Sequence, residues 1–137
     1  MSASIEPHLW TDDFESSVAF YRNALGFDVA AWYPDETTAT WCRLRRGDAE
    51  LMVAVTPDPD GLAPNQGYLA AVAERVGRPG PLSLYLHVDD ADAVHAAATA
   101  AGARIVEEIW DAWWGGRQFT VADPDGNWWT VFRSSDT

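Results

Sequence analysis

The chain has 137 residues, of which 47% are hydrophobic and 22% charged, a composition typical of one globular domain with a substantial core. Asp and Glu number 21 against 9 Lys and Arg, and the net charge of -12 disfavours nucleic acid and anionic membrane surfaces as partners. The chain lacks both an apolar run of ~18 residues that would span a membrane and the basic, apolar start of a secretory signal, so we expect a cytoplasmic protein.

The first half of the chain predicts a strand, a helix and three further strands. The first strand pattern covers residues 4–10, and the segment after it carries apolar residues at helical spacing: Phe14, Val18, Tyr21 and Leu25. Asp12 or Asp13 caps the start of this helix, and Gly26 suits the left-handed position after its end. Three segments enriched in β-branched and aromatic residues follow: FDVAAWY, TATWCRLR and ELMVAV.

A segment rich in proline and glycine, from about residue 57 to 80, separates the two halves. Such a composition is typical of a connection or lid. Within it, YLAAVAERV predicts a short helix over residues 68–76.

The second half repeats the order of the first. Residues 81–88 predict a strand, a helix begins at Asp89 or Asp90 and ends at Gly102, and three strands follow: RIVEEI, GRQFTVA and WWTVFR. Asp89 lies as far from Asp13 as Gly102 lies from Gly26, which indicates an internal duplication. We therefore expect an α+β fold: a single domain over residues 1–137 with two βαβββ modules, about 1–56 and about 81–135.

A four-stranded sheet with a helix on one face leaves its other face bare, and two such sheets facing each other enclose a cavity. Alternation along the strands predicts core positions at Leu51, Val53 and Val55. The same alternation predicts side chains that line the cavity: Glu6, His8, Trp10, Glu50, Met52, Tyr85, His87, Trp128, Thr130 and Phe132.

Two motifs resemble a known family. The helix SSVAFYRNALGF and the closing hairpin FTVADPDGNWWTVF are similar to the corresponding segments of the vicinal oxygen chelate superfamily, which includes glyoxalases, extradiol dioxygenases, fosfomycin-modifying enzymes and bleomycin-resistance proteins. The similarity runs through the whole chain in order. It implies paired βαβββ modules around a cavity, commonly completed by a homodimer, but it does not select one activity because this fold hosts many.

In the metalloenzymes of that family, four His, Glu or Gln side chains from four strands hold a divalent ion. The matching positions here carry Glu6, Ser83, Thr130 and Met52, or Glu50 in place of Met52 if the register slips by two. Ser, Thr and Met are poor ligands for such ions, which favours a site without metal. The alternative is a displaced site for nickel, zinc, iron or manganese built from Glu6, His8, Glu50 and His87.

Aromatic side chains supply most of the predicted ligand surface. Trp10, Tyr85, Trp128 and Phe132 are candidates for the cavity wall, and a loop before the last hairpin adds Trp110, Trp113 and Trp114. Trp41 and Trp129 are expected to fill the core between sheet and helix or a dimer interface. Arg117 either orients an acidic group of a ligand or pairs with a nearby carboxylate.

The leading hypothesis is a binding protein similar to the bleomycin-resistance type, without metal and without catalytic residues. It predicts a protein that confers antibiotic resistance by sequestering a toxic natural product, cationic or aromatic, in a cleft lined by aromatic side chains. The alternatives are a metal-dependent lyase, isomerase or dioxygenase of glyoxalase-like type, and a protein-interaction module that binds no small ligand.

Overall fold

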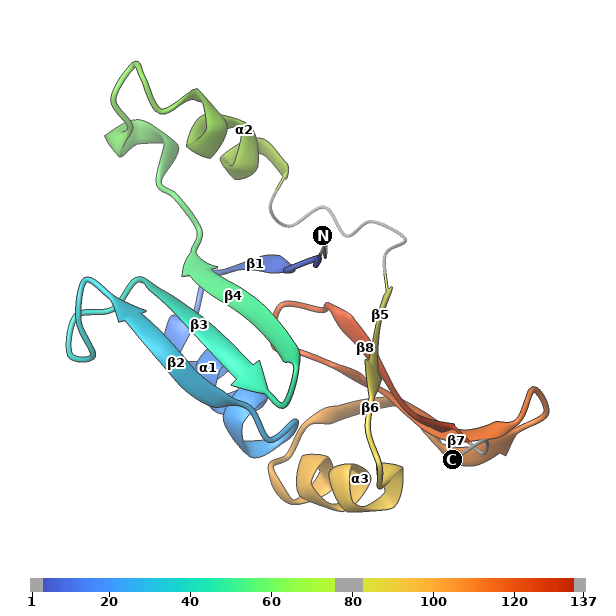
Figure 1. Cartoon of the computed structure of the whole chain (residues 1–137). Helices are drawn as coiled ribbons and strands as arrows, with labels where there is room; N and C mark the ends of the chain where they lie inside the picture. The colour runs from blue at the N-terminus through green and yellow to red at the C-terminus, as the bar shows by residue number, and fades with distance from the viewer. Residues whose placement is uncertain (1–3, 76–82, 135–137) are drawn as a thin grey trace.

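The computed structural model describes residues 4–75 and 83–134, which form the two expected βαβββ modules (Figure 1). The first module comprises β1 (His8–Thr11), α1 (Phe14–Asn23), β2 (Asp28–Tyr33), β3 (Trp41–Arg46) and β4 (Ala49–Val55). Its strands form one mixed sheet in the order β1-β4-β3-β2, in which only the pairing of β1 with β4 is parallel.

The second module repeats this topology with β5 (Ser83–His87), α3 (Ala91–Ala100), β6 (Arg104–Ala112), β7 (Gly116–Ala122) and β8 (Trp128–Ser134), in the sheet order β5-β8-β7-β6. Between the modules lie a 3-10 turn, η1 (Pro59–Gly61), and the short helix α2 (Gly67–Arg75). The end of the predicted helix at Val76 falls outside the described residues. Within 4–75 and 83–134, no helix is long and apolar enough to cross a bilayer.

The two long helices begin in the same way. The carboxylate of Asp13 accepts a hydrogen bond from the backbone N–H of Ser16, and that of Asp90 accepts one from Ala93. Each bond satisfies an amide that would otherwise lack a partner in the first helical turn. The cap of α3 is therefore Asp90 and not Asp89, one residue later than the spacing between Gly26 and Gly102 predicts.

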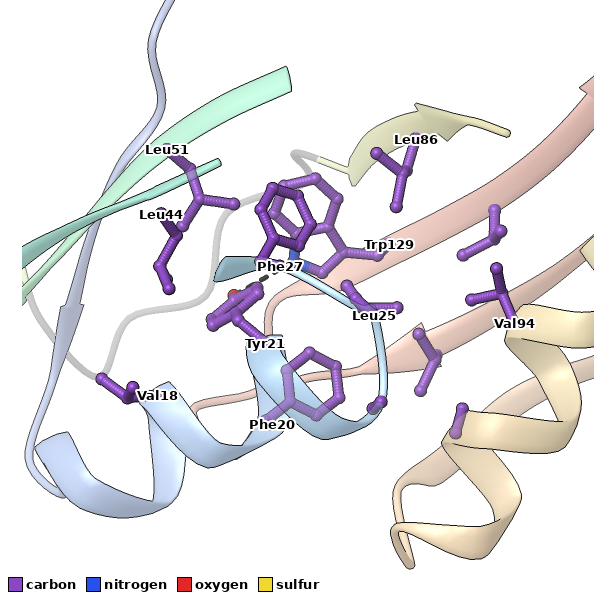
Figure 2. Packing of buried hydrophobic residues seen from close by; sticks show 14 of the residues in the cluster. Val18, Phe20, Tyr21, Leu25, Phe27, Leu44, Leu51, Leu86, Val94 and Trp129 are labelled. Carbon is purple, nitrogen blue, oxygen red and sulfur yellow. Dashed lines mark hydrogen bonds between the residues drawn. The ribbon is translucent and has the colours of Figure 1, made fainter. Parts of the chain in front are cut away.

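The helices α1 and α3 lie between the two sheets, so the buried side chains of both modules form one cluster. Figure 2 shows Tyr21 and Trp129 in the middle of this cluster, with Leu44 of the first sheet on one side and Leu86 of the second on the other. Val55, predicted for the core, is 38% exposed because it is the last residue of β4, at the rim of the sheet.

A chain of hydrogen bonds joins α1 to the closing hairpin of the other module. The Tyr21 hydroxyl donates to Asp123 Oδ2 at 2.6 Å and accepts from Trp129 Nε1 at 3.1 Å. The Asp123 carboxylate also accepts from the backbone amides of Asp125 and Asn127 and from Asn127 Nδ2, at 2.7–3.0 Å. Burial and the adjacent Asp123 charge raise the pKa of Tyr21 well above its usual value, so the hydroxyl remains a donor.

Replacing Tyr21 with Phe should destabilise the protein, because it takes a donor from the buried Asp123 carboxylate and an acceptor from Trp129. We expect the free energy of unfolding to fall by about 1–3 kcal/mol, measured by urea denaturation. Tyr68→Phe is the matched control, since the Tyr68 side chain is 69% exposed, and it should change stability little. Equal stabilities for the two variants would contradict the structural role of the Tyr21 hydroxyl.

Candidate functional site

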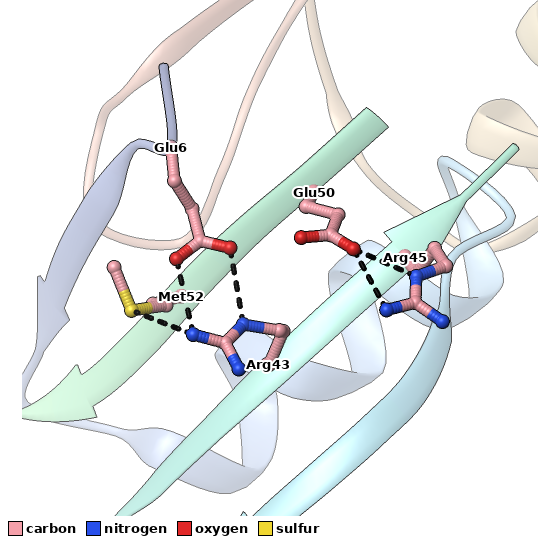
Figure 3. Close-up of polar contacts among 5 residues, drawn as sticks. All are labelled: Glu6, Arg43, Arg45, Glu50 and Met52. Atoms are coloured by element: carbon pink, nitrogen blue, oxygen red, sulfur yellow. Dashed lines mark hydrogen bonds and ion pairs between the residues drawn. The ribbon is translucent and has the colours of Figure 1, made fainter. Parts of the chain in front are cut away.

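Two arginines of β3 hold the carboxylates on the open face of the first sheet, the face turned away from the helices (Figure 3). Arg43 donates from Nε and Nη2 to both oxygens of Glu6, at 3.0 and 3.2 Å. Arg45 donates from Nε to Glu50 at 2.8 Å, which lowers the pKa of that carboxyl. The sequence interpretation missed both arginines, although their alternation with the buried Cys42 and Leu44 places them on this face.

The side chains at the family's ligand positions do not fit a divalent metal within one chain. Of the alternative set, Glu6 and Glu50 are paired with arginines, and His87 lies on the other sheet. The Thr130 hydroxyl shares a hydrogen bond of 2.9 Å with that of Thr120. In residues 4–75 and 83–134, no three His, Cys, Asp or Glu side chains converge to hold an ion.

An apolar pocket of about 680 Å³ opens on the same face of the first sheet. Its walls include Trp10, Trp41 and Tyr33, and Leu62 and Leu69 border it from the connection between the modules. Trp41, expected in the core or at a dimer interface, lies on the open face and not in the core: it shares this face with Arg43, whose guanidinium carbon lies 5.3 Å from the Trp41 ring centroid. The volume is in the range of small-molecule sites.

Within residues 4–75 and 83–134, two polar atoms of residues that line the pocket are buried without a hydrogen-bond partner: Nδ1 of His8 and Oγ1 of Thr56. The His8 ring packs against Trp10, with centroids 4.3 Å apart. Burial disfavours the protonated imidazole and lowers the pKa of His8 below 6.5, more than hydrogen bonding to its own backbone and the charge of Glu6 raise it. His8 is therefore mainly uncharged at neutral pH.

The predicted site residues of the second module lie together on the open face of its own sheet. The parallel pairing of β5 with β8 sets Tyr85 beside Thr130 and His87 beside Phe132, and the His87 and Phe132 rings meet edge to face at 5.6 Å. Tyr85 and Trp128 are about half exposed. This group is thus separate from the pocket, whose lining comes from the first module and the connection.

The tryptophans before the last hairpin form a small cluster of their own. Trp114 packs edge to face against both Trp110 and Trp113, with centroids 5.4 and 5.0 Å apart, and Trp113 remains 86% exposed. Gly116, the first residue of β7, permits the close approach of Phe132, because a β-carbon at this position would collide with the Phe132 ring.

Of the two roles considered for Arg117, the structure shows the pairing with carboxylates. The guanidinium donates to Asp92 of α3 at 2.8 and 3.0 Å and to Asp111 of β6 at 3.1 Å. Arg117 therefore lies on the helix-facing side of the second sheet, where it links α3 to β6 and is away from the open face.

Comparison with known proteins agrees with this architecture. The Glyoxalase/Bleomycin resistance protein/Dioxygenase superfamily matches residues 4–131. The chain belongs to this superfamily. An uncharacterized protein of Mycobacterium bovis is 29% identical over 129 residues, which cover 93% of this chain and 81% of that protein.

Two solved structures superpose over nearly the whole chain. TioX from Micromonospora sp. ML1 matches with a TM-score of 0.72 and 25% identity, over 98% of each chain. A bleomycin resistance determinant encoded on the transposon Tn5 matches with a TM-score of 0.64 and 26% identity, over 97% of this chain and 98% of that one.

The lowered pKa of His8 predicts a pH-dependent loss of stability. The unfolded chain binds a proton near pH 6.5, whereas folded His8 binds it only at lower pH. This contribution to stability is therefore complete above about pH 6.5 and is lost as the pH falls toward the folded pKa. Ring-proton NMR should report a His8 pKa below 6.5, and His8→Asn should flatten the acid side of the stability profile; a pKa at or above 6.5 would refute the argument.

Proposed function

We propose that this protein binds and sequesters an aromatic small molecule in the pocket of the first module, without a metal ion and without breaking a bond. The observation that carries the proposal is the contrast between two parts of one sheet face. Trp10, Trp41 and Tyr33 wall an apolar pocket, whereas Arg43 and Arg45 pair with the carboxylates near the family's metal positions. Stacking and apolar burial supply the binding energy in such a site.

The comparison with the Tn5 bleomycin resistance determinant supports a role in resistance to a toxic natural product. That protein is similar to this chain along almost its entire length. A binder protects a cell by lowering the free concentration of the toxic molecule, so it needs affinity and no catalytic group. The residues described here fit that requirement better than they fit metal-dependent lyase, isomerase or dioxygenase chemistry.

We further propose a homodimer in which the second sheet of one copy faces the pocket of the other. In a single chain the open face of the second sheet carries Tyr85 and Trp128, which are about half exposed, although Thr120 and Thr130 on the same face are buried. A cleft between the two faces would bring these aromatics opposite Trp10 and Trp41 and bury more of a large ligand. The predicted site residues of both modules would then share one cleft.

Tryptophan fluorescence should detect the ligand. In a panel of neutral and cationic aromatic antibiotics that includes bleomycin, we expect at least one saturable quencher. Trp41→Leu should weaken its binding about tenfold, whereas Trp41→Phe, which keeps an aromatic wall, should weaken it by less than about threefold. Dialysis of the protein against EDTA should leave its affinity for this quencher unchanged. A stoichiometric metal whose removal abolishes binding would overturn the proposal.

Sedimentation equilibrium should give twice the mass of one chain at micromolar concentration. Trp128→Glu, which places a charge on the open face of the second sheet, should shift the equilibrium toward monomer. Asp28→Glu is a suitable control, because Asp28 is exposed at the start of β2 and keeps its charge in the variant. A wild-type protein that remains monomeric at 100-fold higher concentration would exclude the dimer.

A further inference from the structure

The pocket of the first module is lined by uncharged groups. Within the described part of the chain its lining residues include no Asp, Glu, Lys or Arg, and the His8 ring in its wall is mainly uncharged at neutral pH. The net charge of -12 is therefore carried by side chains elsewhere on the molecule. A cationic group that entered the pocket would lose hydration without gaining a counter-ion from the wall, which is unfavourable.

One carboxylate lies close to the pocket, but Arg43 balances its charge. The charge of Glu6 acts on the His8 ring, which places Glu6 near the pocket wall. Arg43 donates from Nε and Nη2 to both oxygens of Glu6, at 3.0 and 3.2 Å. A guanidinium that pairs in this way engages both oxygens of the carboxylate and balances its charge. Glu6 is therefore not available as an anchor for a cationic ligand.

Arg43 also contacts the aromatic wall of the pocket. Its guanidinium carbon lies 5.3 Å from the Trp41 ring centroid, within the range in which a cation is attracted to an aromatic face. Trp41 thus already has a cationic partner, and a second cation stacked on this ring would be repelled by the guanidinium charge. An uncharged aromatic ligand meets no such repulsion and still buries its surface against Trp10 and Trp41.

We propose that Arg43 sets the charge preference of the pocket, so that the pocket recognises uncharged aromatic molecules and rejects cationic ones. This inference rests on the proposed binding function and defines the chemical class of its ligand. Arg43 does not line the pocket and acts as a positioning residue through Glu6 and Trp41. A repulsive element of this kind is a general source of specificity. The sequence-based expectation of a cationic or aromatic ligand thereby narrows to an uncharged aromatic one.

Three probes of similar outline separate charge from aromatic surface: 2-naphthylmethanol, 2-naphthylmethylammonium and 2-naphthoate. Their binding to the full chain is followed near neutral pH by the indole N–H signals of Trp10 and Trp41 in ¹⁵N-labelled protein. We expect the uncharged alcohol to bind about fivefold more tightly than either charged probe, because the pocket lining offers a counter-ion to neither.

Arg43→Gln removes the guanidinium charge beside Trp41 and leaves Glu6 without its ion pair. It should raise the affinity for the ammonium about fivefold and leave that for the alcohol within about twofold. Arg45→Gln is the matched control. It makes the same change of charge and breaks the corresponding ion pair with Glu50, two residues farther along β3. It should change the affinity for the ammonium by less than about twofold.

Two further measurements separate the charge of Arg43 from a structural role. Arg43→Lys keeps a positive charge beside Glu6, so it should keep the wild-type ratio of the affinities for the alcohol and the ammonium. The indole N–H of Trp129 donates to the Tyr21 hydroxyl in the core, and its signal should hold its position in every variant that keeps the fold.

The outcomes separate this inference from the binding function. If wild-type protein binds either charged probe more tightly than the alcohol, the uncharged class is wrong while the aromatic pocket stands. If Arg45→Gln or Arg43→Lys raises the affinity for the ammonium as much as Arg43→Gln does, the role of Arg43 is wrong. If no probe moves the signals of Trp10 and Trp41, the inference and the proposed pocket fall together.

Discussion

The hydrogen bond from the Tyr21 hydroxyl to the buried Asp123 carboxylate joins the two halves of this molecule. It connects the first helix of one module to the last turn of the other across 102 positions of sequence. Asp123 in turn organises its own turn by accepting from Asp125 and Asn127. The helix motif and the hairpin motif by which the family is recognised therefore contact each other in the fold. They indicate the fold and not the chemistry of the site.

Because this contact fixes α1 between the sheets, each sheet uses one face for the core and leaves the other free. Two neighbouring tryptophans of β8 lie on opposite faces of the sheet. Trp129 is buried against Tyr21, whereas Trp128 is about half exposed on the open face. The core face is constrained by close packing with both helices. On the open face, Thr130 shares a hydrogen bond with Thr120 and Met52 accepts one from Arg43, so the fold accommodates threonine and methionine at these positions.

Local patterns predicted much of this architecture, and their failures have physical causes. The helix spacing, the capping aspartates and strand alternation are properties of neighbouring residues, so they are visible in the sequence. Hydrogen-bond partners on distant strands cannot be seen in the sequence. Arg43 meets Glu6 only through the pairing of β3 with β4 and of β4 with β1, and without that register Glu6 was interpreted as a cavity-lining residue or a metal ligand. Trp41 was expected in the core or at a dimer interface because tryptophan is apolar, and alternation with the buried Cys42 places it on the open face and not in the core.

The two modules share one topology, but only the first contributes to the pocket. Both modules present an open sheet face, but only the first continues into the connection whose Pro57, Leu62 and Leu69 border the pocket. Module repetition thus supplies two similar surfaces, and the unduplicated segment converts one of them into a concave apolar site. The shape of the pocket in this protein therefore depends on the segment that interrupts the repeat together with side chains that the repeat positions.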